Sequence, residues 1–492
     1  MKSAYFRELQ RYTKSEISNA LDATEEISDL LRKLKLVGIL KSVKPAVEKM
    51  NLFELDFEEV VISDVESEDP GQLFVFDFVG IVSINNYLIK CFPKYISHDD
   101  RLLGSMQKIL KALQKYNYQE QFIDISHGAE NRDQFNMLSV ILYLIDDYHT
   151  NGVYTNQKEI FEIMGDGEID WDTTINETYP IIKNNRPHYL NYFSHASVDD
   201  DQDYFRRLHE CVISDCSRLL NETELNSLFQ IDEQYPYQGN ISDFGNEDYI
   251  LFSLNKELST QFITRKQLLL KTISVYISRR KSFRDGSGLC LYGTSNFNLV
   301  WEKVCRDVFG DLLSDRLYEL PIKLKPPFKD RENDRLIELI EKPIWKALVN
   351  EEYISNIASD TLIPDIVGMY SNDTSLCFGI FDAKYYRIKL DESGVRDQPG
   401  ISDITKQYLY QLVFSCFIET HDFGKVINAF LFPGDEDDSV VLGEVELPVL
   451  RDLKDPALTN ILAVKLPSNK MYDWYISGEK VDIYRDIPCI VG

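Results

Sequence analysis

The chain carries two apolar stretches near its carboxyl-terminal end that decide the expected fold. Residues 362–370 read LIPDIVGMY and residues 376–386 read LCFGIFDAKYY. The residues 371–374 between them, SNDT, are typical of a turn. Short apolar runs bounded by turn residues indicate β-strands, so the pattern predicts two adjacent antiparallel strands in this part of the chain.

Three charged residues interrupt or border these strands. Asp365 and Asp382 would meet at one edge of the sheet, and Lys384 projects from the same face as Asp382 because side chains alternate along a strand. Two carboxylates can hold a divalent cation, and an ammonium beside them can position a water or offset charge on a phosphate. This is the arrangement of the nuclease motif written PD…(D/E)xK.

A motif this short also occurs by chance. Asp365 and Asp382 would then be ordinary strand-end acids, with Lys384 as their ion-pair partner. Asp382 and Lys384, however, directly follow the apolar run 377–381, which is typical of a central strand. Charges at positions that are costly to desolvate are more often functional than decorative. The context therefore favours a site of chemistry.

Glu302 is a further candidate because of the helix on which it lies. A helix is expected from a cap at Thr294 or Ser295 to Phe309. Glu302 lies on the flank of the apolar stripe of this helix, from which it could point toward the two strands. A glutamate on a helix flank is more often simply solvated, so this signal is weak by itself.

Further elements complete an order known from nucleases. The pattern predicts a second helix at about 332–348, a helix that starts near Asp403, and a strand over 426–433. Helix, strand, strand, helix, strand is the order of the PD…(D/E)xK fold.

Composition and charge bound the possible functions. The 492 residues are 44% hydrophobic and 27% charged, as in ordinary globular proteins, and the formal net charge is −27. Such acidity opposes unaided DNA binding, although residues 1–49 carry ten Lys and Arg against seven Asp and Glu. No apolar run is long enough to span a bilayer, no signal peptide is evident, and the eight cysteines form no CxxC pair. We expect a reduced cytoplasmic protein with no membrane contact.

The amino-terminal segment resembles a winged helix-turn-helix. Helices are expected at 14–21 and 25–36, and a strand follows within 37–43. Winged helices bind DNA in some proteins and dock other proteins elsewhere, and both roles stay open for residues 1–55.

The middle of the chain mixes strands with helices. Strands are expected at 73–82 and 87–91, with a hairpin-like stretch at 165–171. Helices are expected at about 99–118, 133–149, 202–219 and 254–280, and residues 284–288 form a candidate linker. The expected fold is multidomain α+β, with a winged-helix-like segment at 1–55, a β-rich middle with helices at 56–285, and an α/β nuclease core at 286–492.

Beyond these patterns, the chain resembles the LlaJI restriction endonuclease family and the related McrC subunits, which are nucleases of the PD…(D/E)xK type. The resemblance covers roughly residues 70–492. It rests on the catalytic motif and on residues 78–82 (FVGIV), 89–96 (IKCFPKYI), 167–175 (GEIDWDTTI), 297–302 (FNLVWE) and 408–411 (YLYQ).

The resemblance implies a role for each site residue. Asp365 and Asp382 would be metal ligands, with the main-chain carbonyl of Ala383, and Lys384 would position the water or stabilise charge. Glu302 would be an additional ligand or a supporting acid. Gln407 and, preferably, Gln411 would be polar supports, and Lys406 and Gln407 are candidates for DNA contact.

The resemblance also implies a cofactor and partners. The expected cofactor is Mg²⁺, for which Mn²⁺ can substitute, and the expected substrate is double-stranded DNA. The implied partner is a separate McrB-like AAA+ GTPase or ATPase, with residues 56–285 as the docking region. This chain itself has no GxxxxGK[ST] phosphate-binding loop.

Two other functions stay open. One is a RecB-like nuclease for DNA repair or processing, and the other is a winged-helix DNA-binding or scaffold protein whose nuclease fold is inactive. Other hydrolytic chemistries are disfavoured, because the seven histidines show no HExxH spacing and the chain has no GxSxG motif.

Overall fold

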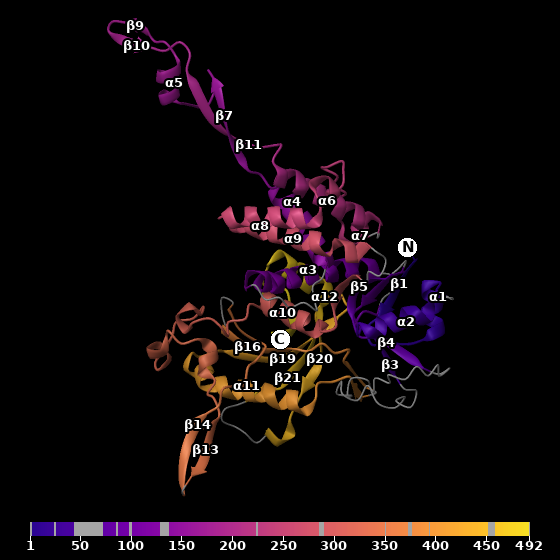
Figure 1. Ribbon diagram of the computed structural model, residues 1–492. Coiled ribbons are helices and arrows are strands. Elements are labelled where there is room, and N and C mark those ends of the chain that lie inside the picture. Colours follow the sequence, from indigo (N-terminus) through magenta and orange to yellow (C-terminus); the bar gives the residue numbers. More distant parts are fainter. Residues whose placement is uncertain are drawn as a thin grey trace. The chain divides into compact units, whose positions relative to one another are not determined.

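The computed structural model describes most of the chain, in two compact units (Figure 1). The first unit comprises Met1–Glu130 and Leu291–Gly492, and the second comprises Asn131–Cys290. The described residues are 2–23, 26–43, 72–84, 87–97, 101–127, 137–222, 225–284, 290–349, 351–371, 376–392, 394–450 and 458–491. The expected mixture of helices and several sheets in more than one domain is confirmed. The predicted boundary at 285 lies near the end of the second unit, whereas the boundary at 55 lies outside the described residues, so the three-domain division stays a prediction.

A five-stranded sheet forms the centre of the carboxyl-terminal part. Its order is β15-β16-β19-β21-β20, and the strands are β15 Ile366–Ser371, β16 Leu376–Ala383, β19 Lys425–Gly434, β21 Ile461–Pro467 and β20 Val440–Val445. β15 runs antiparallel to β16, whereas β16, β19 and β21 are mutually parallel and β20 is antiparallel to β21. The two predicted strands around the PD…(D/E)xK residues are therefore neighbours, as expected.

Helices cover both faces of this sheet, which explains why β16 is apolar apart from Asp382. On one face, α11 (Ile401–Thr420) packs Phe414 and Phe417 against Phe378 and Ile380 of β16. On the other face, α10 (Phe297–Phe309) places Phe309 at 5.0 Å from Phe381, measured between ring centroids. α12 (Ser468–Ser477) and α3 (Leu102–His127) pack beside α10. A strand that is buried between two helical layers is apolar at nearly every position, and a polar residue occurs there where it has a hydrogen-bond or ion-pair partner or a functional role.

The predicted helix at 332–348 is wrong. This segment contains a 3₁₀ turn, Leu336–Leu339, and then a strand, β13 (Ile344–Val349), which pairs with β14 (Glu352–Ile357) as a projecting hairpin (Figure 1). Glu351, which directly precedes β14, adopts a positive φ of 68°. The aromatic and β-branched residues of β13 favour a strand. The antiparallel pairing of β13 with β14 stabilises that strand, and hydrophobic periodicity within 332–348 alone does not show this pairing.

The amino-terminal helices agree with their predictions. α1 is Lys14–Leu21 and α2 is Ile27–Leu36, and Thr13 caps α1 with Glu16 in a reciprocal capping box. They accompany a three-stranded antiparallel sheet of order β2-β4-β3, with the strands β2 Arg11–Thr13, β4 Leu73–Phe76 and β3 Leu40–Val43. The winged-helix interpretation stays a prediction, and residues 44–55 lie outside the described part of the chain.

A second sheet of the first unit joins distant parts of the sequence. Its order is β1-β6-β5-β12, and the strands are β1 Lys2–Arg7, β6 Tyr87–Phe92, β5 Val79–Ile84 and β12 Cys290–Thr294. β1 had no sequence prediction and pairs in parallel with β6. Gly80 has φ +141°, and a Cβ at this residue would lie 2.0 Å from the carbonyl oxygen of Tyr292. Only glycine permits this approach of β5 to β12.

The second unit consists of a helical part and an extended arm. The helices are α4 Met137–Asn151, α6 Tyr204–Glu222, α7 Leu225–Phe229, α8 Glu247–Thr260 and α9 Thr264–Arg284. The single predicted helix at 254–280 is wrong, because residues 261–263 separate α8 from α9. Gln261 accepts hydrogen bonds from the main-chain N–H groups of Phe262 and Ile263 through Oε1, which stabilises this break.

The arm extends from the helices of the same unit along two long paired strands (Figure 1). Its elements are β7 Gln157–Ile163, β8 Glu168–Ile169, α5 Trp171–Glu177, β9 Ile181–Lys183, β10 Arg186–His188 and β11 Phe193–Asp199. β11 pairs with both β7 and β8, and β9 pairs with β10 as a hairpin. The hairpin expected at 165–171 is thus only partly present, because Trp171 begins a helix.

Candidate active site

The ends of β15 and β16 bring the two candidate carboxylates together. Asp365 immediately precedes β15, and Asp382 is the penultimate residue of β16. The pairing of Ile366 with Phe381 sets the register, and the main-chain N–H of Ala383 donates a 3.0 Å hydrogen bond to Oδ2 of Asp365. The carboxylate before one strand is therefore tied to the end of the other.

Lys384 completes this group from the residue after β16. Its Nζ lies 3.1 Å from Oδ2 of Asp382 and 3.0 Å from Oδ1 of Asp403, and its main-chain N–H donates to the carbonyl of Leu431 at 2.9 Å. Burial alone would lower the pKa of Lys384, but the charge of Asp382 and the hydrogen bond to Asp403 outweigh it and raise that pKa. Lys384 is therefore held as a cation.

Asp382 has the most perturbed environment of the group. Its side chain is 8% exposed. Burial raises its pKa to about 8, aided by the hydrogen bond to Asp365 and by the charge of Asp365, and Lys384 only partly opposes this. The raised pKa of Asp382 means that the folded protein favours a positive charge at this carboxyl group, which a bound cation would supply in place of a proton.

Glu302 lies near this group but is not part of it. Burial raises the pKa of Glu302, and the charges of Lys384 and Arg306 oppose the shift. Within the described ranges, no three His, Cys, Asp or Glu side chains converge closely enough to hold a metal ion. The structure thus assembles Asp365 with Asp382 and leaves Glu302 beside them, so a ligand role for Glu302 stays a prediction.

The donor set nevertheless fits the expected ion. Mg²⁺ keeps several waters and is commonly bound through one or two carboxylates. Asp365 and Asp382 supply two carboxylates, with the main chain of Ala383 between Asp382 and Lys384. Two neighbouring carboxylates concentrate negative charge at one place, and a bound cation would offset that charge.

The two glutamines of α11 support the sheet from its buried side. Gln407 is fully buried, and its Nε2 donates to the carbonyl of Ile380 at 3.1 Å. Oε1 of Gln411 accepts hydrogen bonds from the main-chain N–H and the hydroxyl of Thr459, at 3.1 and 3.0 Å, and from Asn428 at 3.3 Å. Gln407 is therefore buried against β16, and its roles as a polar support or a DNA contact stay predictions. Lys406, which is exposed, keeps its place as a candidate for DNA contact.

Sequence reasoning assigned no role in the site to three residues. Asp403 contacts Lys384 from the first turn of α11, and the hydroxyl of Tyr410 donates to the carbonyl of Ile363 at 3.0 Å, just before Asp365. Arg306 donates through Nε to the main-chain carbonyl of Asp365 at 3.2 Å. Only Arg306 had a local signal, its spacing of four residues from Glu302 on one helix.

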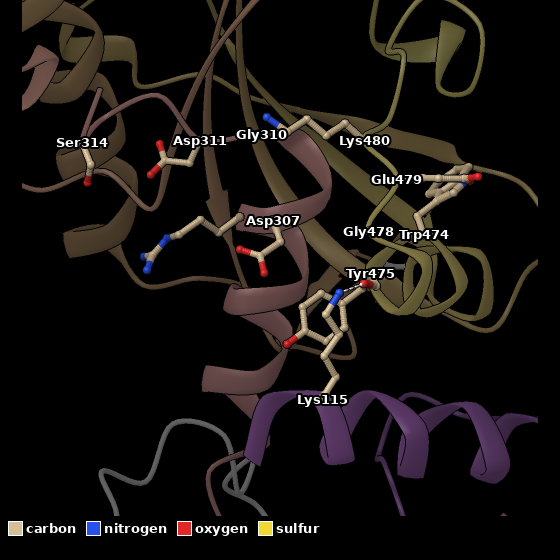
Figure 2. A pocket seen from close by; sticks show the side chains of 11 residues that line it. Lys115, Asp307, Gly310, Asp311, Ser314, Trp474, Tyr475, Gly478, Glu479 and Lys480 are labelled. Atoms are coloured by element: carbon tan, nitrogen blue, oxygen red, sulfur yellow. Dashed lines mark hydrogen bonds between the residues drawn. The ribbon is translucent and has the colours of Figure 1, made fainter. Parts of the chain in front are cut away.

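A cleft of about 440 Å³, which Arg306 also lines, lies at the carboxyl-terminal end of α10 (Figure 2). Arg306, Lys115 and Lys480 line it together with Asp307, Asp311 and Glu479. Nζ of Lys115 donates to the carbonyl of Tyr475 at 2.5 Å, drawn as a dashed line in Figure 2. The cleft is lined by both basic and acidic side chains, and neither Asp365 nor Asp382 lines it. It is therefore not the candidate metal site.

Comparison with known proteins gives the family. The profile described as LlaJI restriction endonuclease matches residues 78–468. This chain belongs to the LlaJI restriction endonuclease family. This LlaJI-family chain is also 28% identical, over 427 residues, to the type II restriction enzyme BsuMI component YdjA of Bacillus subtilis (strain 168). That alignment covers 84% of this chain and 83% of the relative. The resemblance to the LlaJI restriction endonuclease family is thereby confirmed.

Solved structures offer a weaker comparison for this LlaJI-family chain. One belongs to a half-complex of McrB AAA+ hexamers with bound McrC from Thermococcus gammatolerans, with 12% identity, a TM-score of 0.36 and coverage of 96% of this chain and 99% of the other. A second belongs to the McrBC complex of the same organism, with 11% identity, a TM-score of 0.25 and coverage of 62% and 86%. These TM-scores are too low to support an argument. Over the described residues, no helix is both long and apolar enough to cross a membrane.

Proposed function

We propose that this chain is the DNA-cleaving subunit of a restriction system that defends against phage, with a Mg²⁺-dependent PD…(D/E)xK site. Membership in a restriction-endonuclease family supports the activity. The observation that supports the site most directly is the meeting of Asp365, Asp382 and Lys384 at the ends of two paired strands. The element order α10, β15, β16, α11 and β19 agrees with that fold.

In this proposal Asp365, Asp382 and the carbonyl of Ala383 hold Mg²⁺, for which Mn²⁺ can substitute. The ion would supply positive charge at the scissile phosphate and a water of lowered pKa. Lys384, kept cationic by Asp382 and Asp403, is suited to orient the water or to stabilise the developing negative charge, and is unsuited to remove a proton. Hydrolysis adds water across one P–O bond, which leaves one product with a phosphate and the other with a hydroxyl.

The acidity of the chain makes a partner part of the proposal. A formal net charge of −27 opposes DNA binding by this chain alone. The arm of the second unit exposes large apolar side chains, among them Phe161 at 61%, Trp171 at 54% and Tyr179 at 98%. Exposed apolar groups in such number are typical of a docking surface. We therefore assign the arm to contact with an McrB-like AAA+ GTPase or ATPase, which would engage DNA and permit cleavage.

A plasmid cleavage assay with Mg²⁺, with and without the neighbouring NTPase and its nucleotide, tests the proposal. Asp382→Ala and Lys384→Ala are expected to abolish cleavage while the circular dichroism spectrum stays unchanged. Asp360→Asn is the matched control, because Asp360 is an exposed acid in the segment before Asp365. Undiminished cleavage by both site variants would contradict the assignment.

The same assay separates the two other functions. Partner-independent degradation from DNA ends would indicate a repair nuclease, and DNA binding without any cleavage would indicate a scaffold. Replacing Trp171 and Tyr179 by serine is expected to remove NTPase-dependent cleavage without lowering the melting temperature. Retention of partner binding by that double variant, measured by sedimentation, would exclude the arm as the docking surface.

A further inference from the structure

A buried glutamate links the amino-terminal sheet to the segment directly after β16, which carries the candidate catalytic lysine. Glu8 follows β1 and is 5% exposed. Its Oε2 accepts a hydrogen bond from the hydroxyl of Tyr385, the residue after Lys384, and another from the main-chain N–H of Lys94 at 3.1 Å. The ammonium of Lys94 lies 4.4 Å from the centroid of the Tyr385 ring. All of these residues belong to the first unit.

Strand pairing holds Glu8 in this position. Arg7 pairs with Phe92 at the end of the parallel β1–β6 ladder, and the main-chain N–H of Glu8 donates to the carbonyl of Phe92 at 2.9 Å. Leu9 then adopts a positive φ of 56° and donates its N–H to the carbonyl of Phe76 at 2.8 Å. The chain turns away immediately after Glu8, so the carboxyl group is fixed at the end of the sheet.

Tyr385 is held on its other sides by aromatic rings. Its ring centroid lies 6.0 Å from that of Tyr95 and 5.4 Å from that of Phe297 at the start of α10. The carbonyl of Lys384 accepts a 3.0 Å hydrogen bond from the N–H of Tyr386. A displacement of Tyr385 would therefore also move the main chain of its neighbours Lys384 and Tyr386, and with it the position of the Lys384 side chain.

A buried carboxyl group at this place is unfavourable unless it is paired. Burial raises the pKa of Glu8, and the charge of Lys94 and the hydrogen bond from Tyr385 oppose the shift. Apolar residues of similar size would pack an interior contact of this kind at a smaller desolvation cost. Compared with an apolar contact, a hydrogen-bonded carboxyl group is directional, because its hydrogen bonds fix the positions of the groups that donate to it.

We infer that Glu8 is a positioning residue of the candidate active site, which holds Tyr385 and so fixes the main chain that carries Lys384. This inference rests on the proposed nuclease function. It also makes the amino-terminal strand, which lies far from the motif in sequence, a necessary part of the cutting site.

Three variants of the full-length chain, assayed with its NTPase partner, test the role of Glu8. Tyr385→Phe removes only the hydroxyl, Glu8→Ala removes the acceptor, and Glu8→Gln keeps an oxygen that can accept both hydrogen bonds. Tyr292→Phe is the matched control, because Tyr292 is equally buried in the same unit and its hydroxyl donates to the carbonyl of Leu110 at 3.3 Å, away from β16. The readouts are kcat and KM for plasmid cleavage, and amide hydrogen exchange across residues 376–390.

Tyr385→Phe and Glu8→Ala are expected to lower kcat about 10- to 100-fold with little change in KM for DNA, as a small misplacement of a catalytic group does. Glu8→Gln should recover most of the lost kcat. Exchange should quicken around Lys384 in the two damaging variants and stay at the wild-type rate in Tyr292→Phe.

The role of Glu8 would be overturned if Tyr385→Phe and Glu8→Ala lowered kcat no more than Tyr292→Phe does and left amide hydrogen exchange around Lys384 unchanged. The exchange measurement needs no cleavage. A wild-type chain that fails to cut DNA therefore contradicts the proposed function, while faster exchange in Tyr385→Phe would still support the link between Glu8 and the strand.

Discussion

The main-chain N–H of Ala383 donates a 3.0 Å hydrogen bond to Oδ2 of Asp365. This single bond connects the residue between Asp382 and Lys384 to the carboxylate that precedes the neighbouring strand. It keeps two acidic groups together although their proximity is electrostatically unfavourable, which is the situation that a bound cation relieves. This geometry, and the strand contacts that support it, have consequences that can be measured.

The stability of the metal-free protein should fall as the pH rises from about 4 to about 8. An unfolded Asp titrates near pH 3.9, whereas folding raises the pKa of Asp382 to about 8. Between these values the folded state binds the extra proton, so raising the pH favours unfolding. Asp382→Asn should remove this dependence and gain about 1–4 kcal/mol relative to wild type between pH 5 and pH 8. Urea denaturation at both pH values, with EDTA present, measures the difference, and parallel pH profiles of the two proteins would contradict it.

Asp403→Asn should lower kcat about tenfold, because Lys384 loses a partner that orients it and keeps it cationic. Since Asp403 helps to raise the pKa of Lys384, the alkaline limb of the pH–rate profile should also move to lower pH. Asp360→Asn serves again as the control. A profile of unchanged shape would show that Asp403 does not act through the lysine.

Glu302→Gln should weaken Mn²⁺ binding less than about tenfold, whereas Asp382→Asn should reduce it beyond detection. The reason is that Asp365 and Asp382 are joined in one group while Glu302 stands beside it. Titration calorimetry with the metal alone distinguishes the two variants. Equal losses would instead establish Glu302 as a full ligand.

Gly80→Ala should destabilise the protein by about 2–5 kcal/mol, since the new Cβ would collide with the carbonyl of Tyr292 at a positive φ. Gly104→Ala is the matched control. Gly104 lies in α3, where an added Cβ would meet no atom within 4 Å, so its replacement should leave the stability unchanged or raise it by up to about 1 kcal/mol. Urea denaturation of both variants measures the contrast, and a neutral Gly80→Ala would show that β5 and β12 can separate.

The sequence by itself determined the elements whose periodicity is local. Apolar runs located β15, β16 and β19, the amphipathic pattern located α1, and the charges that border an otherwise apolar strand singled out Asp382. The predictions were wrong in short segments whose hydrophobic periodicity fits a helix and a strand equally well. The pattern predicts a helix where the strand β13 forms. The break between α8 and α9 is stabilised by Oε1 of Gln261, which accepts hydrogen bonds from the main-chain N–H groups of Phe262 and Ile263.

Only the tertiary structure decided which distant residues support the candidate site. Asp403 reaches Lys384 from another element, Arg306 reaches the carbonyl of Asp365, and Glu8 reaches Tyr385 across 377 positions of sequence. The physical reason is that hydrophobic periodicity records how much of each residue is buried, whereas it does not record which partner buries it. That choice is made by strand pairing and helix packing, which bring the residue after the amino-terminal strand into contact with Tyr385.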